Sequence, residues 1–440
     1  MALKRADRQV VFDQVIKEPT MAFLRKSPFS ACAIVMSRSM STSHWAGVPM
    51  GPPDPILGLN EAFAKDTDKR KVNLGVGAYR DNNGQPLVLS SVRQAEEAVV
   101  AAKMNKEYAG IAGVAGFVNH SMKFAYGDSP QLKDGLVVGM QALSGTGSCR
   151  MALDFFARFK GKDAVVWVPD PTWPNHNNMI KDAGMQVKTY RYYDPATRGL
   201  AFGPFMDDLK AMPDGQIILF HSCAHNPTGV DPSPKQWSEI ADLCAKKNHH
   251  AFMDTAYQGF ASGNADIDGF SVREMLKKGV STSCAQSFAK NFGLYGERVG
   301  AFSIVCANKD EKDRVESQLK ILIRPMYSNP PIHGARIVEK ILGTPELYSL
   351  WKGECKGMAD RIIEMRKLLR KTVEANHKSK WTHITDQIGM FAYTGLTAPQ
   401  CESMIKDHHI YMTKNGRVSM AGVFPGNVEY IGKAIAAVSQ

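Results

Sequence analysis

Lys290 is the lysine whose sequence surroundings best suit chemistry. It follows residues 284–288, a strand-like run, and lies within the sequence Ser-Phe-Ala-Lys-Asn-Phe-Gly that begins at Ser287. A lysine amine acts as a nucleophile or base only when unprotonated, a form that burial and neighbouring cations favour. Serine β-lactamases share the Ser-x-x-Lys spacing, but their Ser-Asp-Asn and Lys-Thr-Gly motifs do not occur in this sequence. A lone lysine after a strand is usually a solvated surface residue, so the candidacy of Lys290 depends on its neighbours.

Polar residues also follow two other predicted strands. Asp254 ends the run 251–254, and Asn226 follows the run 217–221. Because ligands gather at the carboxyl ends of parallel strands, we expect both side chains to converge with Lys290. The purely structural alternatives are that Asp254 caps a helix and that Asn-Pro-Thr-Gly, beginning at Asn226, is an ordinary turn.

A short glycine-rich segment precedes a predicted helix and consists of Ser144, Gly145, Thr146 and Gly147. Free N–H groups and the helix dipole make such a helix start suitable for a phosphate group. The same four residues could equally form a plain loop.

Strand-like and helix-like segments alternate through the middle of the chain. This alternation predicts an α/β fold in which helices sandwich a mixed, mostly parallel sheet. After about residue 357, a long amphipathic helix and short strands predict a smaller α+β domain, completed by the segment before residue 86. Strands are expected at 164–168, 217–221, 251–254, 284–288, 390–393 and 417–420, and helices at 235–248 and 358–374. The expected divisions are a terminal segment at 1–45, an arm and part of the small domain at 46–86, the large domain at 87–356 and the small domain at 357–440.

Composition excludes several classes of protein. The chain has 440 residues, a net charge of +11 and 44% hydrophobic residues, which is ordinary for a globular protein. No apolar run approaches the roughly 18 residues that span a bilayer, and no basic stripe is interleaved with aromatics. We therefore expect no integral membrane segment and no nucleic-acid partner. The eight cysteines form no Cys-x-x-Cys pair, which favours reduced thiols.

Two further patterns point to chemistry that we reject. His221 and His225 have the spacing of zinc ligands on a helix, but they follow a strand-like run and lead into Asn-Pro, so we expect no metal. Gly75-Val76-Gly77 could begin a dinucleotide-binding loop, giving a dehydrogenase. The sequence Ala-Tyr-Arg follows where a third glycine and a helix should begin, which weakens that interpretation.

The N-terminal segment has the composition of an organellar transit peptide. Between Glu18 and Asp54 it holds no acidic residue but several serines and the basic residues Arg25, Lys26 and Arg38. We expect import into the mitochondrial matrix and removal of this segment. The start at Met1 or Met21 and the cleavage site stay open, and a disordered tail is the alternative.

From about residue 45 to residue 439 the chain resembles the fold-type-I enzymes that use pyridoxal 5′-phosphate (PLP). Within the class-I aminotransferase family it is most similar to the aspartate aminotransferases of the mitochondrial type. The resemblance implies the PLP-transferase fold of type I. The segments that carry it lie at 51–58, 73–81, 223–232, 257–263, 287–298, 323–331 and 410–417.

The resemblance implies roles for the cofactor site. Lys290 would hold PLP as an aldimine and shuttle a proton, and Asp254 would pair with the pyridine nitrogen, with His176 supporting Asp254. Asn226 and Tyr257 would bind the phenolic oxygen of the ring, and Trp173 would stack on it. The phosphate would lie in a cradle made of Ser144, Gly145, Thr146, Ser287 and Arg298, and Tyr108 would reach it from a partner subunit.

The resemblance also implies transamination between L-aspartate and 2-oxoglutarate in ping-pong half-reactions, by a homodimer with shared active sites. Arg417 would clamp the α-carboxylate, and a buried Arg324 would bind the distal carboxylate across the dimer interface. Gly77, Trp173 and Asn226 would also contact substrate. A planar guanidinium binds a carboxylate through two hydrogen bonds, which independently favours dicarboxylate amino and keto acids as substrates.

Some questions stay open at this stage. An aromatic or kynurenine aminotransferase of the same fold is the nearest alternative, and a non-catalytic carrier or scaffold is a more distant one. Ala109-Gly110 stands where the family usually has Leu-Pro, which adds backbone freedom near the phosphate site. The physiological direction of the reaction and any additional role are not fixed by the sequence.

Overall fold

The computed structural model describes residues 43–51 and 57–440. Contacts divide the chain into two compact units, Met1–Pro52 and Pro53–Gln440. The described part of the first unit includes a turn closed by a 3.0 Å hydrogen bond from the Ala46 N–H to the Ser43 carbonyl. Most of the predicted transit segment, both candidate start residues and residues 52–56 of the motif at 51–58 lie outside the described residues.

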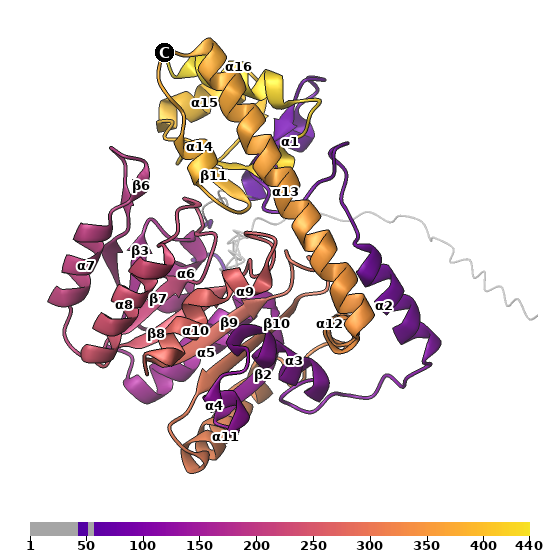
Figure 1. Ribbon diagram of the computed structural model, residues 1–440, viewed down its shortest axis with the longest axis vertical. Helices are drawn as coiled ribbons and strands as arrows, with labels where there is room; N and C mark the ends of the chain where they lie inside the picture. The colour runs from indigo at the N-terminus through magenta and orange to yellow at the C-terminus, as the bar shows by residue number, and fades with distance from the viewer. Residues whose placement is uncertain (1–42, 52–56) are drawn as a thin grey trace, which may run out of the picture. The chain divides into compact units, whose positions relative to one another are not determined.

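A mixed seven-stranded sheet forms the centre of the second unit (Figure 1). Its order is β2-β10-β9-β8-β7-β3-β4. Strand β10 runs antiparallel to both of its neighbours, and the other pairs are parallel. The sheet and its helices confirm the predicted fold class. Its strands are β2 (Val137–Leu143), β3 (Val165–Asp170), β4 (Gln186–Arg191), β7 (Ile217–His221), β8 (His250–Thr255), β9 (Ser281–Ser287) and β10 (Val299–Val305).

Apolar side chains cover both faces of this sheet. In β7, Ile217 and Leu219 pack into one core, while Ile218 and Phe220 pack into another. Successive strand residues point to opposite faces, so a run that is apolar throughout indicates a strand covered on both sides. Helix α5 packs on β2, β8, β9 and β10, and its residues belong to the first core, whereas α8 and α10 contribute to the second.

The helices follow local capping signals. Helix α8 begins after Ser233, whose side chain accepts from the Gln236 N–H while the Gln236 side chain accepts from the Ser233 N–H. None of the described helices is long and apolar enough to cross a membrane. The helices are α1 (Leu57–Lys65), α2 (Ser90–Ala101), α3 (Ala115–Tyr126), α4 (Pro130–Lys133), α5 (Ser144–Lys160), α6 (Pro174–Asp182), α7 (Phe202–Ala211), α8 (Pro234–Lys246), α9 (Ala265–Asp268), α10 (Phe270–Lys277), α11 (Lys309–Met326), α12 (His333–Gly343), α13 (Pro345–Asn376), α14 (His383–Asp386), α15 (Ala398–Lys406) and α16 (Val428–Val438).

Two small sheets lie outside the large one, and one of them joins an early segment of the chain to a late one. Strand β11 (Phe391–Tyr393) pairs antiparallel with β13 (Arg417–Ser419), and β1 (Val72–Asn73) pairs in parallel with β12 (Ile410–Tyr411). A further short pair joins β5 (Tyr193–Asp194) to β6 (Gly199–Leu200), and the 3₁₀ helix η1 covers Met420–Gly422. The predicted helix at 358–374 is part of α13, which begins earlier, at Pro345. The domain divisions near residues 86 and 357 stay a prediction.

Candidate active site

One cavity brings together most of the residues that the sequence singled out. Its lining also includes His221, Cys223, Ala256 and Phe391, which the sequence did not assign to the site. The predicted residues that line it are Gly77, Ser144, Gly145, Thr146, Trp173, Asn226, Asp254, Tyr257, Ser287, Lys290, Arg298 and Arg417.

The strand register places the chemical groups side by side. His221, at the end of β7, pairs with Asp254 in β8, and Asp254 pairs with Ala285 in β9. Lys290 follows the end of β9 by three residues. The carboxyl ends of three adjacent parallel strands therefore converge on the cavity, as the sequence predicted.

Asp254 lies at the end of a series of hydrogen bonds. One backbone N–H group determines which atom donates in each of them. The Asn226 N–H donates to His221 Nδ1 at 3.2 Å, so the proton of a neutral His221 is on Nε2. That nitrogen lies 3.0 Å from Thr172 Oγ1, which lies 2.9 Å from His176 Nδ1. His176 Nε2, 3.0 Å from Asp254 Oδ2, is then the donor to the carboxylate. This arrangement leaves Oδ1 of Asp254 available to accept from a group in the cavity.

The surroundings of these hydrogen bonds favour the neutral form of His221 and the ionised form of Asp254. Burial lowers the pKa of His221 to about 3, which agrees with its neutral form. Burial alone would raise the pKa of Asp254, but the hydrogen bond from His176 and the nearby positive charges outweigh it, and the pKa lies below its usual value. Asp254 is only 9% exposed, so its negative charge is held where a protonated ring nitrogen would be a favourable partner.

Lys290 is partly buried and lies over Tyr257, with Nζ 5.5 Å from the ring centroid. Burial lowers the pKa of this amine, the charge of Asp254 opposes the shift, and the charge of Arg298 adds to it. The net direction is downward, so a larger fraction of Lys290 is unprotonated and nucleophilic than for a solvated lysine.

The cavity also has an anion-binding end. Helix α5 begins at Ser144, directly after β2, and its first residues line the cavity together with Ser287 and Arg298. The hydroxyl oxygens of Ser144 and Ser287 lie 3.1 Å apart. Gly145 packs closely, since a β-carbon there would lie 3.1 Å from the Ser287 Cβ. The start of a 17-residue helix beside an arginine suits a phosphate group.

Arg417 lies in β13 and is 4% exposed. Its guanidinium donates to Asn226 Oδ1 at 3.3 Å and to the Gly75 carbonyl at 2.9 Å. It also lies 4.2 Å from the centre of the Phe391 ring. Nε is buried without a partner in the described part of the chain. An unpartnered buried donor is costly, and a carboxylate in the cavity would satisfy it.

Three predicted residues do not line this cavity. Tyr108 is 82% exposed, and Arg324 is exposed at the end of α11, where it donates to Ser328 Oγ at 2.5 Å. The sequence interpretation placed a buried Arg324 at a dimer interface. In the single chain this side chain is exposed, so its burial in a dimer stays a prediction. His176 lies behind the lining, in contact with Asp254.

Sequence reasoning missed three contributors to the site. Thr172 joins the two histidines, and His221, weighed only as a metal ligand, fixes their protons. Phe391 supports the Arg417 guanidinium. The available sequence signals were a threonine two residues after a strand and a histidine at a strand end.

Within the described residues, Cys149, His176 and Asp254 offer ligand atoms within 4.8 Å of one another. Both nitrogens of His176 are already engaged, and burial raises the pKa of the Cys149 thiol well above its usual value. A neutral thiol is a poor metal ligand, so this cluster suits a hydrogen-bonded network better than a metal.

The fold and the site together define an aminotransferase of class I and II. The family model with that description matches residues 69–435, and the chain belongs to this family. Similarity to individual proteins supports the same family assignment. The chain is 52% identical over 405 residues to the mitochondrial aspartate aminotransferase of Dictyostelium discoideum, covering 91% of this chain and 95% of that protein.

Solved structures of aminotransferases are also similar to this chain. The mitochondrial aspartate aminotransferase of Trypanosoma brucei matches with a TM-score of 0.84 and 45% identity, over 87% of this chain and all (100%) of that one. The aromatic-amino-acid aminotransferase of Burkholderia pseudomallei, solved covalently bound to pyridoxal phosphate, matches with a TM-score of 0.88 and 40% identity, over 91% of this chain and 100% of that one.

Aminotransferases of this class use PLP, and the residues present fit it. The start of α5 and Arg298 suit its phosphate, while the free oxygen of Asp254 suits its ring nitrogen. Lys290, with its lowered pKa, suits its aldehyde.

Proposed function

We propose that this chain is an aspartate aminotransferase. It exchanges an amino group between L-aspartate and 2-oxoglutarate in two ping-pong half-reactions, yielding oxaloacetate and L-glutamate. The observation that carries the proposal is the grouping of Lys290, Asp254 and Arg417 around one cavity with an anion-binding end. The names of relatives that are 52% identical support the choice of aspartate.

The residues that would hold PLP are those of the cavity. The phosphate would bind to Ser144, Gly145, Thr146, Ser287 and Arg298. Trp173 would stack on the ring, Asp254 would pair with its nitrogen, and Asn226 and Tyr257 would bind its phenolic oxygen. When bound, PLP supplies an aldehyde that condenses with amines and a protonated ring that withdraws electrons from the substrate Cα.

Lys290 then acts as the base. Its Nζ takes the proton from the substrate Cα, and the lowered pKa provides the unprotonated amine that this step needs. Asp254 would pair with the ring nitrogen and favour its protonated form, and His176 holds the carboxylate in place through the 3.0 Å hydrogen bond to Oδ2. Burial raises the pKa of Tyr257, so its phenol stays a hydrogen-bond donor.

Substrate carboxylates bind to arginines. Arg417 would hold the α-carboxylate, close to Gly77 and to Asn226, the partner of its guanidinium. We further propose a homodimer in which Arg324 of one protomer binds the distal carboxylate in the site of the other, and Tyr108 reaches the phosphate. The exposure of both side chains in the single chain supports this arrangement.

We also propose that the protein works in the mitochondrial matrix after removal of a presequence within residues 1–45. The basic, acid-poor and serine-rich composition of that segment and the mitochondrial relatives support this. Residues 46–86 and 357–440 would form the small domain and 87–356 the large one, which the pairing of β1 with β12 supports.

The visible absorption spectrum of the PLP-loaded protein tests the function. Aspartate is expected to abolish the visible band, and 2-oxoglutarate is expected to restore it. No spectral change with aspartate would contradict the proposal. A faster change with phenylalanine or kynurenine than with aspartate would instead favour an aromatic or kynurenine aminotransferase.

A further inference from the structure

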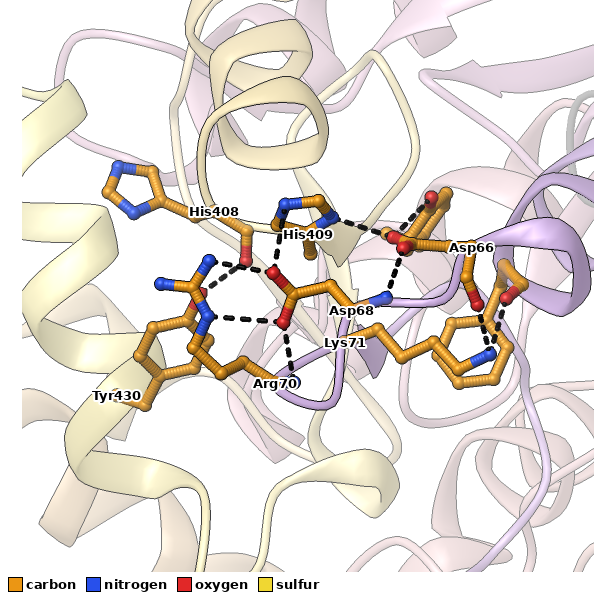
Figure 2. A network of polar contacts seen from close by, with 9 residues as sticks. Asp66, Asp68, Arg70, Lys71, His408, His409 and Tyr430 are labelled. Carbon is orange, nitrogen blue, oxygen red and sulfur yellow. Dashed lines mark hydrogen bonds and ion pairs between the residues drawn. The ribbon is translucent and has the colours of Figure 1, made fainter.

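Two aspartates bind the imidazole of His409, away from the cavity. Figure 2 shows this ring between the carboxylates of Asp66 and Asp68, which follow α1. Nδ1 lies 2.7 Å from Asp66 Oδ2, and Nε2 lies 3.2 Å from Asp68 Oδ2. The Nδ1 contact is a hydrogen bond, and the Nε2 contact places the second ring nitrogen within ion-pair distance of Asp68, so one ring bridges the two carboxylates.

The surrounding groups keep both carboxylates charged. The Asp68 N–H donates to Asp66 at 2.8 Å, and this bond and His409 lower the pKa of Asp66 to about 2. Tyr411 donates its hydroxyl to Asp66 Oδ2 at 2.8 Å. Arg70 donates to Asp68 Oδ2 at 2.7 Å and lowers the pKa of that carboxyl. We call Asp66, Asp68 and His409 the aspartate clasp.

The clasp lies at the start of a backbone ladder. The Val72 N–H donates to the carbonyl of His409 at 3.0 Å, and the Leu74 N–H donates to the carbonyl of Tyr411 at 2.8 Å. These bonds extend the parallel pairing of β1 with β12. The segment from Asp68 to Leu74 is therefore tied to the segment from His409 to Tyr411 at both ends.

The far end of this ladder reaches the active site. The Leu74 carbonyl accepts the Ser419 N–H at 2.7 Å, which joins the ladder to β13. The next carbonyl, that of Gly75, accepts from the Arg417 guanidinium at 2.9 Å. A shift of β1 would move this acceptor and with it the orientation of Arg417.

The backbone of His409 indicates that its side chain matters. Its φ of 53° lies in the left-handed region, where glycine is favoured and a histidine is strained. A turn with no task for its side chain would be better served by glycine. The contacts of the imidazole with Asp66 and Asp68 give the side chain such a task.

We propose that His409 is a positioning residue for dicarboxylate binding: the aspartate clasp fixes β1, and β1 fixes the Gly75 carbonyl that orients Arg417. This inference rests on the proposed function, in which Arg417 binds the α-carboxylate. It assigns to the clasp an effect on substrate affinity and none on proton transfer at Lys290.

His409→Gln tests the inference, with His408→Gln as the matched control. The imidazole of His408 lies apart from both carboxylates in Figure 2. In the PLP-loaded enzyme, His409→Gln is expected to raise KM for aspartate about tenfold and to change kcat less than twofold, while His408→Gln changes neither beyond twofold. Binding of succinate, measured by calorimetry, is expected to weaken in parallel with KM.

Hydrogen exchange gives a readout that is independent of turnover. In His409→Gln the amides of Val72 and Leu74 are expected to exchange at least tenfold faster, with β7, β8 and β9 unchanged. His409→Gly, which relieves the backbone strain, is expected to show the same loss of protection and affinity. Asp68→Asn keeps the contact with Asp66 and is expected to give a smaller effect in the same direction, which covers the case that His409→Gln does not fold.

Three results would overturn the inference. They are equal KM values in His409→Gln and His408→Gln, unchanged exchange at Val72 and Leu74, or faster exchange with unchanged succinate binding. An enzyme inactive with aspartate would refute the proposed function, whereas the exchange and succinate measurements would still decide the role of the clasp.

Discussion

Replacing Arg417 by lysine keeps the positive charge but removes the planar group that the site is built around. The guanidinium donates to Asn226 Oδ1 and to the Gly75 carbonyl, and its buried Nε has no partner among the described residues. A lysine ammonium cannot keep both contacts and also bind a carboxylate through two hydrogen bonds. Hydrogen bonds to charged groups contribute about 1.5–3 kcal/mol each, so losing two costs about 3 kcal/mol or more.

We therefore expect Arg417→Lys to lower kcat/KM for aspartate by roughly a hundredfold or more. Initial rates with aspartate and 2-oxoglutarate measure this, and circular dichroism checks that the variant is folded. Arg191→Lys is a matched control, because Arg191 pairs with Asp208 at an exposed site and should leave kcat/KM unchanged. A loss below threefold in Arg417→Lys would refute the assignment of Arg417 to the α-carboxylate.

Three further changes have defined outcomes. Arg324→Ala is expected to lower kcat/KM for aspartate at least about a hundredfold, roughly 3 kcal/mol, with a smaller effect on phenylalanine in the same rate assay. Gly300→Ala is expected to destabilise the fold by about 1–3 kcal/mol in urea titration, because its β-carbon would lie 2.5 Å from the Ser144 backbone, whereas Gly296→Ala has open space. Burial lowers the pKa of His383 from 6.5 to about 4, so the unfolded chain takes up a proton before the folded one does. The contribution of His383 to the free energy of unfolding should then be fully present above pH 6.5 and be lost, by up to about 3 kcal/mol, toward pH 4. His383→Gln should reduce the measured slope by that amount in urea titrations.

Each of these three predictions has its own contradicting result. A less than threefold effect of Arg324→Ala would remove the distal-carboxylate role. Equal stability of the two glycine variants would show that the contact between β10 and Ser144 adapts at little cost. A slope between pH 6.5 and 4 that is identical in His383→Gln would assign the acid sensitivity to other groups.

The strands and the strand-end residues could be predicted from the sequence because both leave local signals. Residues 217–220 are all apolar, and together with His221 they form β7. Asp254 and Lys290 also follow strand-like runs, and the parallel topology then places them together. Family motifs extended this to the phosphate end of the cavity.

The start of helix α13 could have been predicted from the sequence but was overlooked. Pro345 is a favourable first position, and Leu347, Trp351 and Cys355 continue an apolar spacing of about four residues.

Features that depend on distant contacts could not be predicted. The link from His221 through Thr172 depends on two strand ends that meet only in the fold. The role proposed for Arg324 depends on a second subunit, which no pattern within one chain can position.

Reduction of the PLP-loaded protein with borohydride, followed by peptide mass spectrometry, tests the central claim most directly. The reduced cofactor is expected on Lys290, and addition of aspartate before reduction should prevent the labelling. Labelling of a different lysine, or no labelling in active protein, would contradict the role assigned to Lys290.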